Sequence, residues 1–337
     1  MEFGISKTRD LRKALRILVL ALVGVTVVFP FYILLIEALH PNLVTMPYPV
    51  ELWPREISLS NYAYLFQKNP IGRWTWNSVV IAVGTSLFQA VLCSMAAYGF
   101  GRTRFRGRKA LLSLTMLLLV IPIQTRVLPL FIIFSEVKLL NTYWAWLPFF
   151  SDAFGIYLLM QYMQAIPMDF DEAARIDGAS LLRTYWNVIL PQTKPALVVL
   201  VTFNFVNQWN DFLYPLIVTR SDRMYPLQLG LSNIFSSAAR GENGGMGVAL
   251  AGAVISFLPT LLIYVCFQNK IIDGMNIRIK AEFLDFATRI TPRLVQFLHD
   301  ILQGWHTDLI CLILFQTDLL LQFFPFHQLS DRTMQVC

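Results

Sequence analysis

Apolar runs long enough to cross a lipid bilayer dominate this sequence. The first run, Ile17 to Ile36, carries no charge and has the roughly 20 residues that a spanning helix requires. Peptide groups in the bilayer interior have no water to bond, so a span has to satisfy them internally, as a helix does. With 56% hydrophobic and only 14% charged residues among 337, we expect an all-α polytopic membrane protein.

Six apolar segments are candidate spans, at about residues 17–36, 78–100, 110–134, 143–166, 196–218 and 248–267. A cleaved signal peptide is the alternative for the first segment, but that run is too long and no small-residue cleavage site follows it. Pro122 and Pro129 interrupt the third segment, whose outer end we expect to be kinked or bent along the membrane surface. Asp152 in the fourth segment is expected to be an interfacial or interhelical partner.

The distribution of lysine and arginine predicts the orientation of the chain. Residues 1–16 hold five of these cations, and the eight residues 102–109 hold five more, whereas the whole of residues 37–75 holds three. Cytoplasmic loops are enriched in lysine and arginine. We therefore expect a cytoplasmic N-terminal segment, 1–16, an external first loop, and residues 167–194 in the cytoplasm after four crossings.

The polar stretch between the fourth and fifth spans predicts two short helices joined by a bend. Acidic residues favour a helix start near Met168, because the positive end of a helix dipole attracts them. Gly178, which tolerates positive φ, predicts that this first helix ends near Asp177. Asp171 and Arg175 lie four residues apart on one helix face, where they can pair.

The second helix of this stretch is expected to be capped by Ser180 and closed by Pro191. In the first helix, Ala173 and Ala174 leave one surface small, so that another protein can approach it closely. Charged side chains surround that surface: Glu172, Arg175 and Asp177. This arrangement favours a docking site, although helix signals alone fit an ordinary amphipathic loop on the membrane surface equally well.

The spacing within the stretch resembles the EAA loop of bacterial ABC importer permeases. Glu172-Ala173-Ala174 is followed after three residues by Gly178, and after nine more by an aliphatic residue, one further residue and Leu190-Pro191. Val188 stands where that family usually has isoleucine. The resemblance implies that this loop sits in a cleft of a separate ATP-binding subunit and transmits its closure to the membrane helices. The coupling residues that it implies are Glu172, Ala173, Ala174, Asp177, Gly178, Leu190 and Pro191.

Motifs along most of the chain, about residues 12–280, are similar to the maltose-transporter-type (MalG-like) permeases of carbohydrate ABC importers. These motifs are Ala96-Ala97-Tyr98 before the turn at 104–108, Leu139 to Trp144, Trp209-Asn210-Asp211-Phe212 and Gly274-Met275. Arg278 departs from the family, which usually has a small residue there. The resemblance implies a type I ABC importer permease fold with six transmembrane helices and a cytoplasmic EAA coupling loop.

The same resemblance implies a membrane permease subunit for a sugar, oligosaccharide or polyol in a bacterial cytoplasmic (inner) membrane. Its implied partners are a second permease subunit, two cytoplasmic ATP-binding subunits and an extracytoplasmic sugar-binding protein. The transmembrane domain would then cover residues 17–280, with residues 281–337 as an extension. The external segment Ser221 to Gly247 is the expected contact for the sugar-binding protein.

The chain itself offers no site for catalysis. It contains no Gly-Lys dipeptide, so the phosphate-binding loop GxxxxGK[ST] is absent from its sequence, and we expect ATP hydrolysis on a partner. Its cysteines and histidines show no metal-ligand spacing, which predicts neither a metal site nor a cofactor. A net charge of +6 suggests nucleic acid in a soluble protein, but here the cations lie beside the spans and orientation explains them better.

Four polar residues of the fifth span recur at the spacing of one helix face: Asn204, Asn207, Gln208 and Asp211. Polar groups are costly against lipid, so this face has to meet protein or water. Amides and a carboxylate suit sugar hydroxyls, and Trp209 could stack on a sugar ring. We therefore expect these five residues to line the substrate pathway. The alternative is that the amides bond only between helices.

Two other functions compete with an importer permease. A secondary transporter would need ion-coupling carboxylates or broken helices at mid-membrane, to which only Asp211 and Pro122 point, and no internal repeat supports it. A membrane scaffold or receptor could use the loop at 172–191 to bind a partner without transport.

The segment 281–337, beyond the resemblance, has three interpretations. Leu309 to Phe326 could be a seventh span, although an aspartate near its middle opposes insertion. Ala281 to Trp305 could lie on the inner membrane surface. The third interpretation, which we favour, is an extension without its own fold, such as a shifted reading frame would produce.

Overall fold

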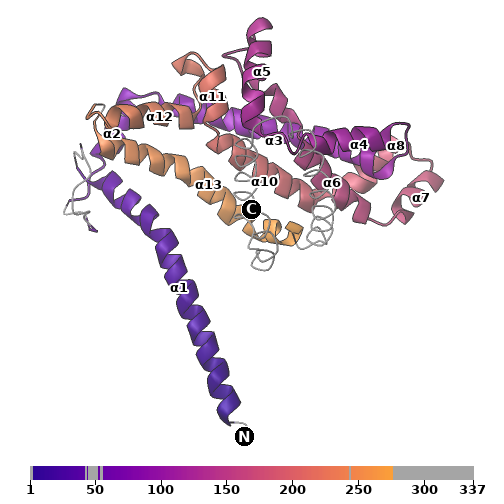
Figure 1. Cartoon of the computed structure of the whole chain (residues 1–337), viewed down its shortest axis with the longest axis horizontal. Helices are drawn as coiled ribbons and strands as arrows, with labels where there is room; N and C mark the ends of the chain where they lie inside the picture. Colours follow the sequence, from indigo (N-terminus) through magenta and orange to yellow (C-terminus); the bar gives the residue numbers. More distant parts are fainter. Residues whose placement is uncertain (1–2, 42–43, 45–51, 54–55, 243, 276–337) are drawn as a thin grey trace, which may run out of the picture. The chain divides into compact units, whose positions relative to one another are not determined.

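The computed structural model describes residues 3–41, 44, 52–53, 56–242 and 244–275 (Figure 1). Within these residues all regular structure is helical, as the apolar runs predict. They belong to a single structural unit, Met1–Ile277. The predicted extension 281–337 and most of the proline-rich part of the first loop lie outside the described residues.

Three helices of the described chain are by themselves long and apolar enough to cross a membrane: Ile17–Leu39, Ile71–Arg102 and Met246–Gln268. The first is part of α1 (Phe3–Leu39), and the last is part of α13 (Met246–Met275). Side chains from Ile17 to Phe31 are exposed, which suits contact with lipid. Further along, α1 packs on α13, where Phe31 and Phe257 stack with ring centroids 4.7 Å apart.

The helix α3 (Ile71–Arg102) is central, because both α6 (Ala153–Ala165) and α10 (Lys194–Asn210) pack along it. At 1.5 Å per residue its 32 residues extend about 48 Å. Most of the side chains that it buries are small or polar, and the large apolar ones are Ile71, Trp74, Ile81 and Tyr98. The small or polar ones are Asn77, Ser78, Ala82, Thr85, Ser86, Gln89, Cys93, Ser94 and Ala97. Small residues let neighbouring helix backbones approach closely.

The other three expected spans are each divided between two helices, and in the third the break ends at Pro122, one of the two prolines expected to interrupt it. The third consists of α4 (Arg108–Leu117) and α5 (Ile123–Glu136), which follows Pro122. The fourth consists of the 3₁₀ helix η1 (Tyr143–Phe150) and α6, and the fifth of α10 and α11 (Leu213–Val218). Aspartates stand at two of these breaks, since Asp152 caps α6 and Asp211 precedes α11.

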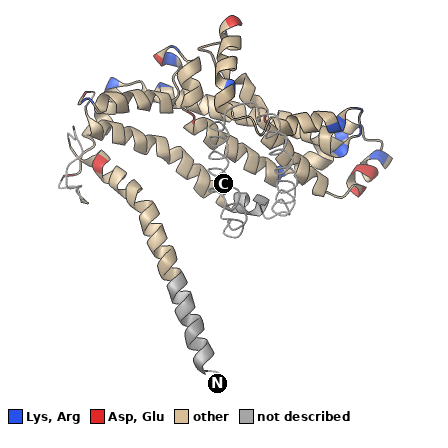
Figure 2. Cartoon of the chain, in the orientation of Figure 1, with Lys and Arg blue, Asp and Glu red and all other residues tan. Residues whose placement is uncertain are grey.

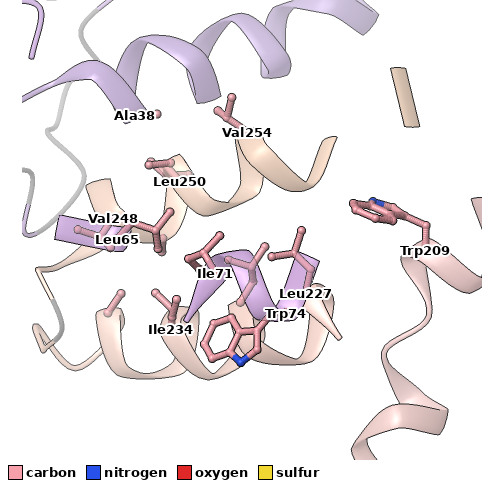
Figure 3. Packing of buried hydrophobic residues seen from close by; sticks show 14 of the residues in the cluster. Ala38, Leu65, Ile71, Trp74, Trp209, Leu227, Ile234, Val248, Leu250 and Val254 are labelled. Carbon is pink, nitrogen blue, oxygen red and sulfur yellow. The ribbon is translucent and has the colours of Figure 1, made fainter. Parts of the chain in front are cut away.

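Helices also form in the segments expected to be external loops. They are α2 (Ser60–Lys68), the short 3₁₀ helix η3 (Asp222–Met224) and α12 (Leu227–Ala238). Apolar side chains from α2, α3, α12 and α13 form one buried cluster, with Trp209 at its side (Figure 3). The segment 221–247 is therefore more than a connecting loop. The segment contains α12, which buries an apolar face that includes Leu227, Leu231 and Ile234.

Candidate coupling site and transport path

The first helix of the expected coupling loop is α7 (Asp169–Ile176), and its bounds agree with the prediction. Gly178 has φ +74°, the left-handed conformation that favours glycine. The N–H of Gly178 donates to Arg175 O at 3.0 Å, and the N–H of Ala179 donates to Ala174 O at 2.9 Å. These two bonds form a Schellman motif, which ends α7 and turns the chain.

The second helix of the loop extends further than predicted. It comprises α8 (Leu181–Thr184), a π-helical turn η2 (Tyr185–Ile189) and α9 (Leu190–Gln192). Ser180 Oγ caps it, as predicted, by accepting from Arg183 N at 3.4 Å. The expectation that Pro191 closes it is wrong, because the chain widens into the π turn, where Leu190 N–H donates to Tyr185 O. The helix instead ends at Gln192, and α10 begins after a bend of 77°.

The residues implied by the EAA resemblance differ in exposure. Glu172, Ala173, Asp177, Gly178 and Pro191 are exposed, and Leu190 is half-buried. Ala174 is only 7% exposed, because it packs within the chain itself. Ala173 is thus accessible to a partner, as the prediction requires, whereas Ala174 is turned into the chain and is not.

Sequence reasoning missed an apolar surface around the glycine turn. Ile176 is 86% exposed, and Leu181 and Leu182 are each 63% exposed. These aliphatic residues flank Gly178 in an otherwise charged loop, a signal that was available in the sequence. Figure 2 shows both signs of charge on α7, so the apolar side chains lie beside charged ones, as in a surface that binds another protein.

Two contacts hold the loop on the helix α3. Tyr185, 1% exposed, has its hydroxyl 2.7 Å from Ser94 Oγ. Asp171 Oδ2 lies 3.1 Å from Arg102 Nη2 at the end of α3. The predicted pairing of Asp171 with Arg175 is therefore wrong, because α7 turns Asp171 toward α3 and Arg175 toward the surface.

The predicted pathway face on α10 separates into several environments. Asn204 is 7% exposed, and its amide donates to Thr85 Oγ1 at 3.4 Å and to Ser86 Oγ at 3.2 Å. Gln208 is also 7% exposed. For Asn204 the structure shows the interhelical bonding that was the alternative to pathway lining.

The remaining three predicted pathway residues point elsewhere. Trp209 is 1% exposed, and its indole donates to Ser256 O of α13 at 3.0 Å, which leaves no free ring face for a sugar in this conformation. Asp211 lies beyond the end of α10, where it accepts from Tyr214 N at 3.4 Å. Asn207 is exposed. The five residues therefore do not share one open surface.

Sequence reasoning also missed the polar face of α3. Asn77 Nδ2 donates to Arg223 O and Tyr225 O, both at 2.9 Å, and Ser78 Oγ accepts from Leu227 N at 2.8 Å. These bonds attach the segment around η3 and the start of α12 to α3. The seven-residue interval between Ser78 and Thr85 in an apolar run was the available signal.

A shallow groove lies between α3 and η1. Its lining includes Phe88, Tyr143, Trp144, Trp146 and Phe150, and Phe88 stacks on Phe150 with centroids 4.3 Å apart. An almost wholly apolar lining suits a hydrocarbon or an apolar side chain better than a sugar, whose hydroxyls need hydrogen-bond partners. The groove therefore adds no substrate site to the predicted pathway.

Comparison with known proteins assigns the family. Residues 89–272 match the family described as "Binding-protein-dependent transport system inner membrane component". The chain belongs to this family. The permease is 31% identical over 253 residues to the arabinooligosaccharides transport system permease protein AraQ of Bacillus subtilis, covering 74% of this chain and 89% of that protein. It is 28% identical over 278 residues to the galactooligosaccharides transport system permease protein GanQ of Bacillus subtilis, covering 80% and 95%.

A solved structure shows the same fold. The permease superimposes with a TM-score of 0.65, at 24% identity, on a chain from a bacterial ABC transporter involved in the import of the acidic polysaccharide alginate, covering 77% of this chain and 96% of that chain. The predicted all-α type I importer permease fold is thus confirmed. Family membership decides against a secondary transporter and a non-transporting scaffold, and it makes the permease a multi-pass membrane protein.

Proposed function

We propose that the permease forms half of the path through which an ABC importer takes up a carbohydrate, and that residues 172–191 dock on a separate ATP-binding subunit. The substrate class is supported by the relatives named for arabino- and galactooligosaccharides. Another relative, from Yersinia enterocolitica and 25% identical, is named for sn-glycerol-3-phosphate, so the class extends to small polyhydroxylated solutes. The sugar, oligosaccharide or polyol is recognised outside by a binding protein.

The observation that carries the docking proposal is the geometry of the glycine turn. A Schellman motif holds Ile176 and Leu181 on either side of Gly178, and all three are exposed. Leaving aliphatic side chains exposed to water is unfavourable, by about 25 cal/mol for each Å² that a partner could bury. No other part of the described chain covers Ile176 and Leu181, whereas a cleft in an ATP-binding subunit would. Glu172 and Asp177 would then make charged contacts at the rim of that cleft.

Orientation and layout belong to the same proposal. Residues 1–16 lie in the cytoplasm, residues 17–280 form the transmembrane domain, and 281–337 is an extension. The support is the cation-rich segment at 102–109, which follows α3 at the end that carries α7. ATP hydrolysis takes place on two cytoplasmic partner subunits, and a second permease subunit completes the path.

The external segment supplies the proposed contact for the binding protein. One solved neighbour, with a TM-score of 0.55, is an alginate ABC transporter in complex with its alginate pentasaccharide-bound periplasmic protein. In the permease, α12 and η3 present the segment 221–247 on the external end of α3, attached through Asn77 and Ser78. A segment held in this way can receive a partner without losing its own structure.

The test uses the complete complex in proteoliposomes, with ATP hydrolysis and solute uptake measured together. Glu172→Ala and Gly178→Leu should remain in the membrane but lose uptake per ATP. Glu136→Ala, an exposed glutamate at the end of α5, is the matched control for the first. Gly107→Leu controls for backbone strain, since Gly107 has φ +86° outside the loop. Normal uptake per ATP in both loop variants would remove the docking proposal.

Substrate class is tested separately. Loaded binding protein should stimulate hydrolysis with an oligosaccharide or a polyol and not with an amino acid or a peptide. Stimulation only by a solute without multiple hydroxyl groups would exclude a carbohydrate importer while leaving the docking result intact.

A further inference from the structure

A buried cation joins the transmembrane helix α3 to the coupling helix α7. Arg102 is the last residue of α3, and its side chain is 1% exposed. A guanidinium removed from water is costly unless other groups pair with it. Arg102 meets three such groups: Asp171 Oδ2 at 3.1 Å, Pro167 O at 3.3 Å and Met168 Sδ at 2.8 Å. All three lie at the start of α7 or directly before it.

The fold selects this pair from among many neighbouring charges. Of the cations that follow α3, Arg104 and Arg106 are exposed. In the first turn of α7, Asp169 and Glu172 are exposed, whereas the Asp171 side chain is 13% exposed. One cation and one carboxylate are thus turned toward each other, while similar residues one or two positions away face outward.

Apolar packing alone holds α7 weakly. Within its eight residues only Ala174 is buried. A single methyl group buries little area, so the charged contacts of Arg102 are the main link between α7 and α3. The helix α3 in turn bonds α10 through Ser86 and Asn204. A displacement of α7 therefore has a direct mechanical connection to the two helices at the centre of the membrane domain.

We propose that the Arg102–Asp171 ion pair fixes α7 to the end of α3, so that movement of α7 by the ATP-binding subunit moves α3. This inference rests on the proposed docking of the loop. Both residues are positioning residues, since neither contacts ATP or solute. Without the ion pair, α7 can still dock on the ATP-binding subunit, but it can pivot on α3. ATP hydrolysis therefore continues while less solute is transported for each ATP hydrolysed.

The experiment measures solute transported per ATP hydrolysed in proteoliposomes that contain the full complex and loaded binding protein. The variants are Arg102→Met, Asp171→Asn, their combination and Arg102→Lys, with Arg104→Met and Asp169→Asn as matched exposed controls. The first two should lower the ratio by about five- to tenfold, within the range by which residues that link two sites change their coupling. The double variant should be no worse than the poorer single variant, and Arg102→Lys should recover most of the ratio.

A purely structural role is distinguished by co-purification of the ATP-binding subunit. The proposal requires that Asp171→Asn, which preserves side-chain size, keeps this subunit at the wild-type level while the ratio falls. A wild-type ratio in both single variants would overturn it, as would an equal fall in the Arg104→Met control or a loss of uptake and hydrolysis only in step with lost complex. If loaded binding protein does not stimulate ATP hydrolysis by the wild-type complex, the proposed function is wrong, and this inference, which rests on it, is overturned as well.

Discussion

Replacing Gly230 by alanine is expected to displace α12 from α3, because Gly230 lies directly against the indole of Trp74. A Cβ on Gly230 would stand 2.1 Å from Trp74 Cε3 and 2.3 Å from Cδ2, whereas ordinary contacts begin at 3.4 Å. The indole would have to retreat by about 1.3 Å. Trp74 is 4% exposed, and its N–H donates to both the carbonyl and the carboxylate of Asp222 at 3.1 Å.

The expected cost combines three effects. Overpacking of a filled site costs about 1–3 kcal/mol. Loss of the indole hydrogen bonds adds about 1 kcal/mol. Alanine offsets about 1 kcal/mol of this, since it favours helix over glycine by that amount. The free energy of unfolding should therefore fall by about 1–3 kcal/mol, and α12 should lose its position against the N-terminal part of α3.

The assay is unfolding of the purified permease in detergent by increasing mole fraction of sodium dodecyl sulfate, followed by tryptophan fluorescence. Gly84→Ala is the matched control in α3, because no atom outside the local helix backbone lies within 4 Å of its added Cβ, so this variant should be as stable as wild type or slightly more stable. In a Trp74→Leu background, Gly230→Ala should lose most of its penalty. The steric argument is refuted if Gly230→Ala is as stable as Gly84→Ala, or if its full penalty persists without the indole.

Three further predictions concern the path and the ends of the molecule. In a protein without native cysteines, Asn207→Cys should react with a water-soluble thiol reagent several-fold faster than Gln208→Cys, since Asn207 is exposed and Gln208 is 7% exposed; equal rates would contradict this arrangement of α10. A photo-cross-linker placed within 221–247 should capture the loaded binding protein, and capture from residues 41–74 alone would move that contact to the first loop. Truncation after Lys280 should preserve assembly and uptake, and loss of either would show that the extension is part of the complex.

The coupling loop could be predicted closely because local chemistry specifies it. A glycine that can adopt positive φ ends α7, and a serine side chain caps the helix that follows. Both effects act within a few residues, so the sequence alone contains them. The π turn before Pro191 was not predictable in this way, since a proline can either end a helix or be accommodated by a change in its hydrogen-bond register.

Pairings between distant segments were less predictable. Asp171 had a plausible partner four residues away, yet its ion pair is with Arg102. A spacing of four shows that two residues share a helix face, but not which way that face points. Asn204 and Gln208 were expected to face protein or water, and the amide of Asn204 donates to two hydroxyls of α3.

The sequence by itself determined the apolar spans, the cation-rich loops and the glycine turn of the coupling loop, because hydration of charge and backbone conformation depend on the residues nearby. Tertiary structure decided which polar groups meet, as when Asn204 bonds to Thr85, 119 positions earlier in the chain. It also decided where the fourth and fifth spans break, because a divided helix is stable only when neighbouring elements satisfy the released peptide groups. Such pairings depend on how α3, α6 and α10 pack together, and no single segment of the chain specifies that packing.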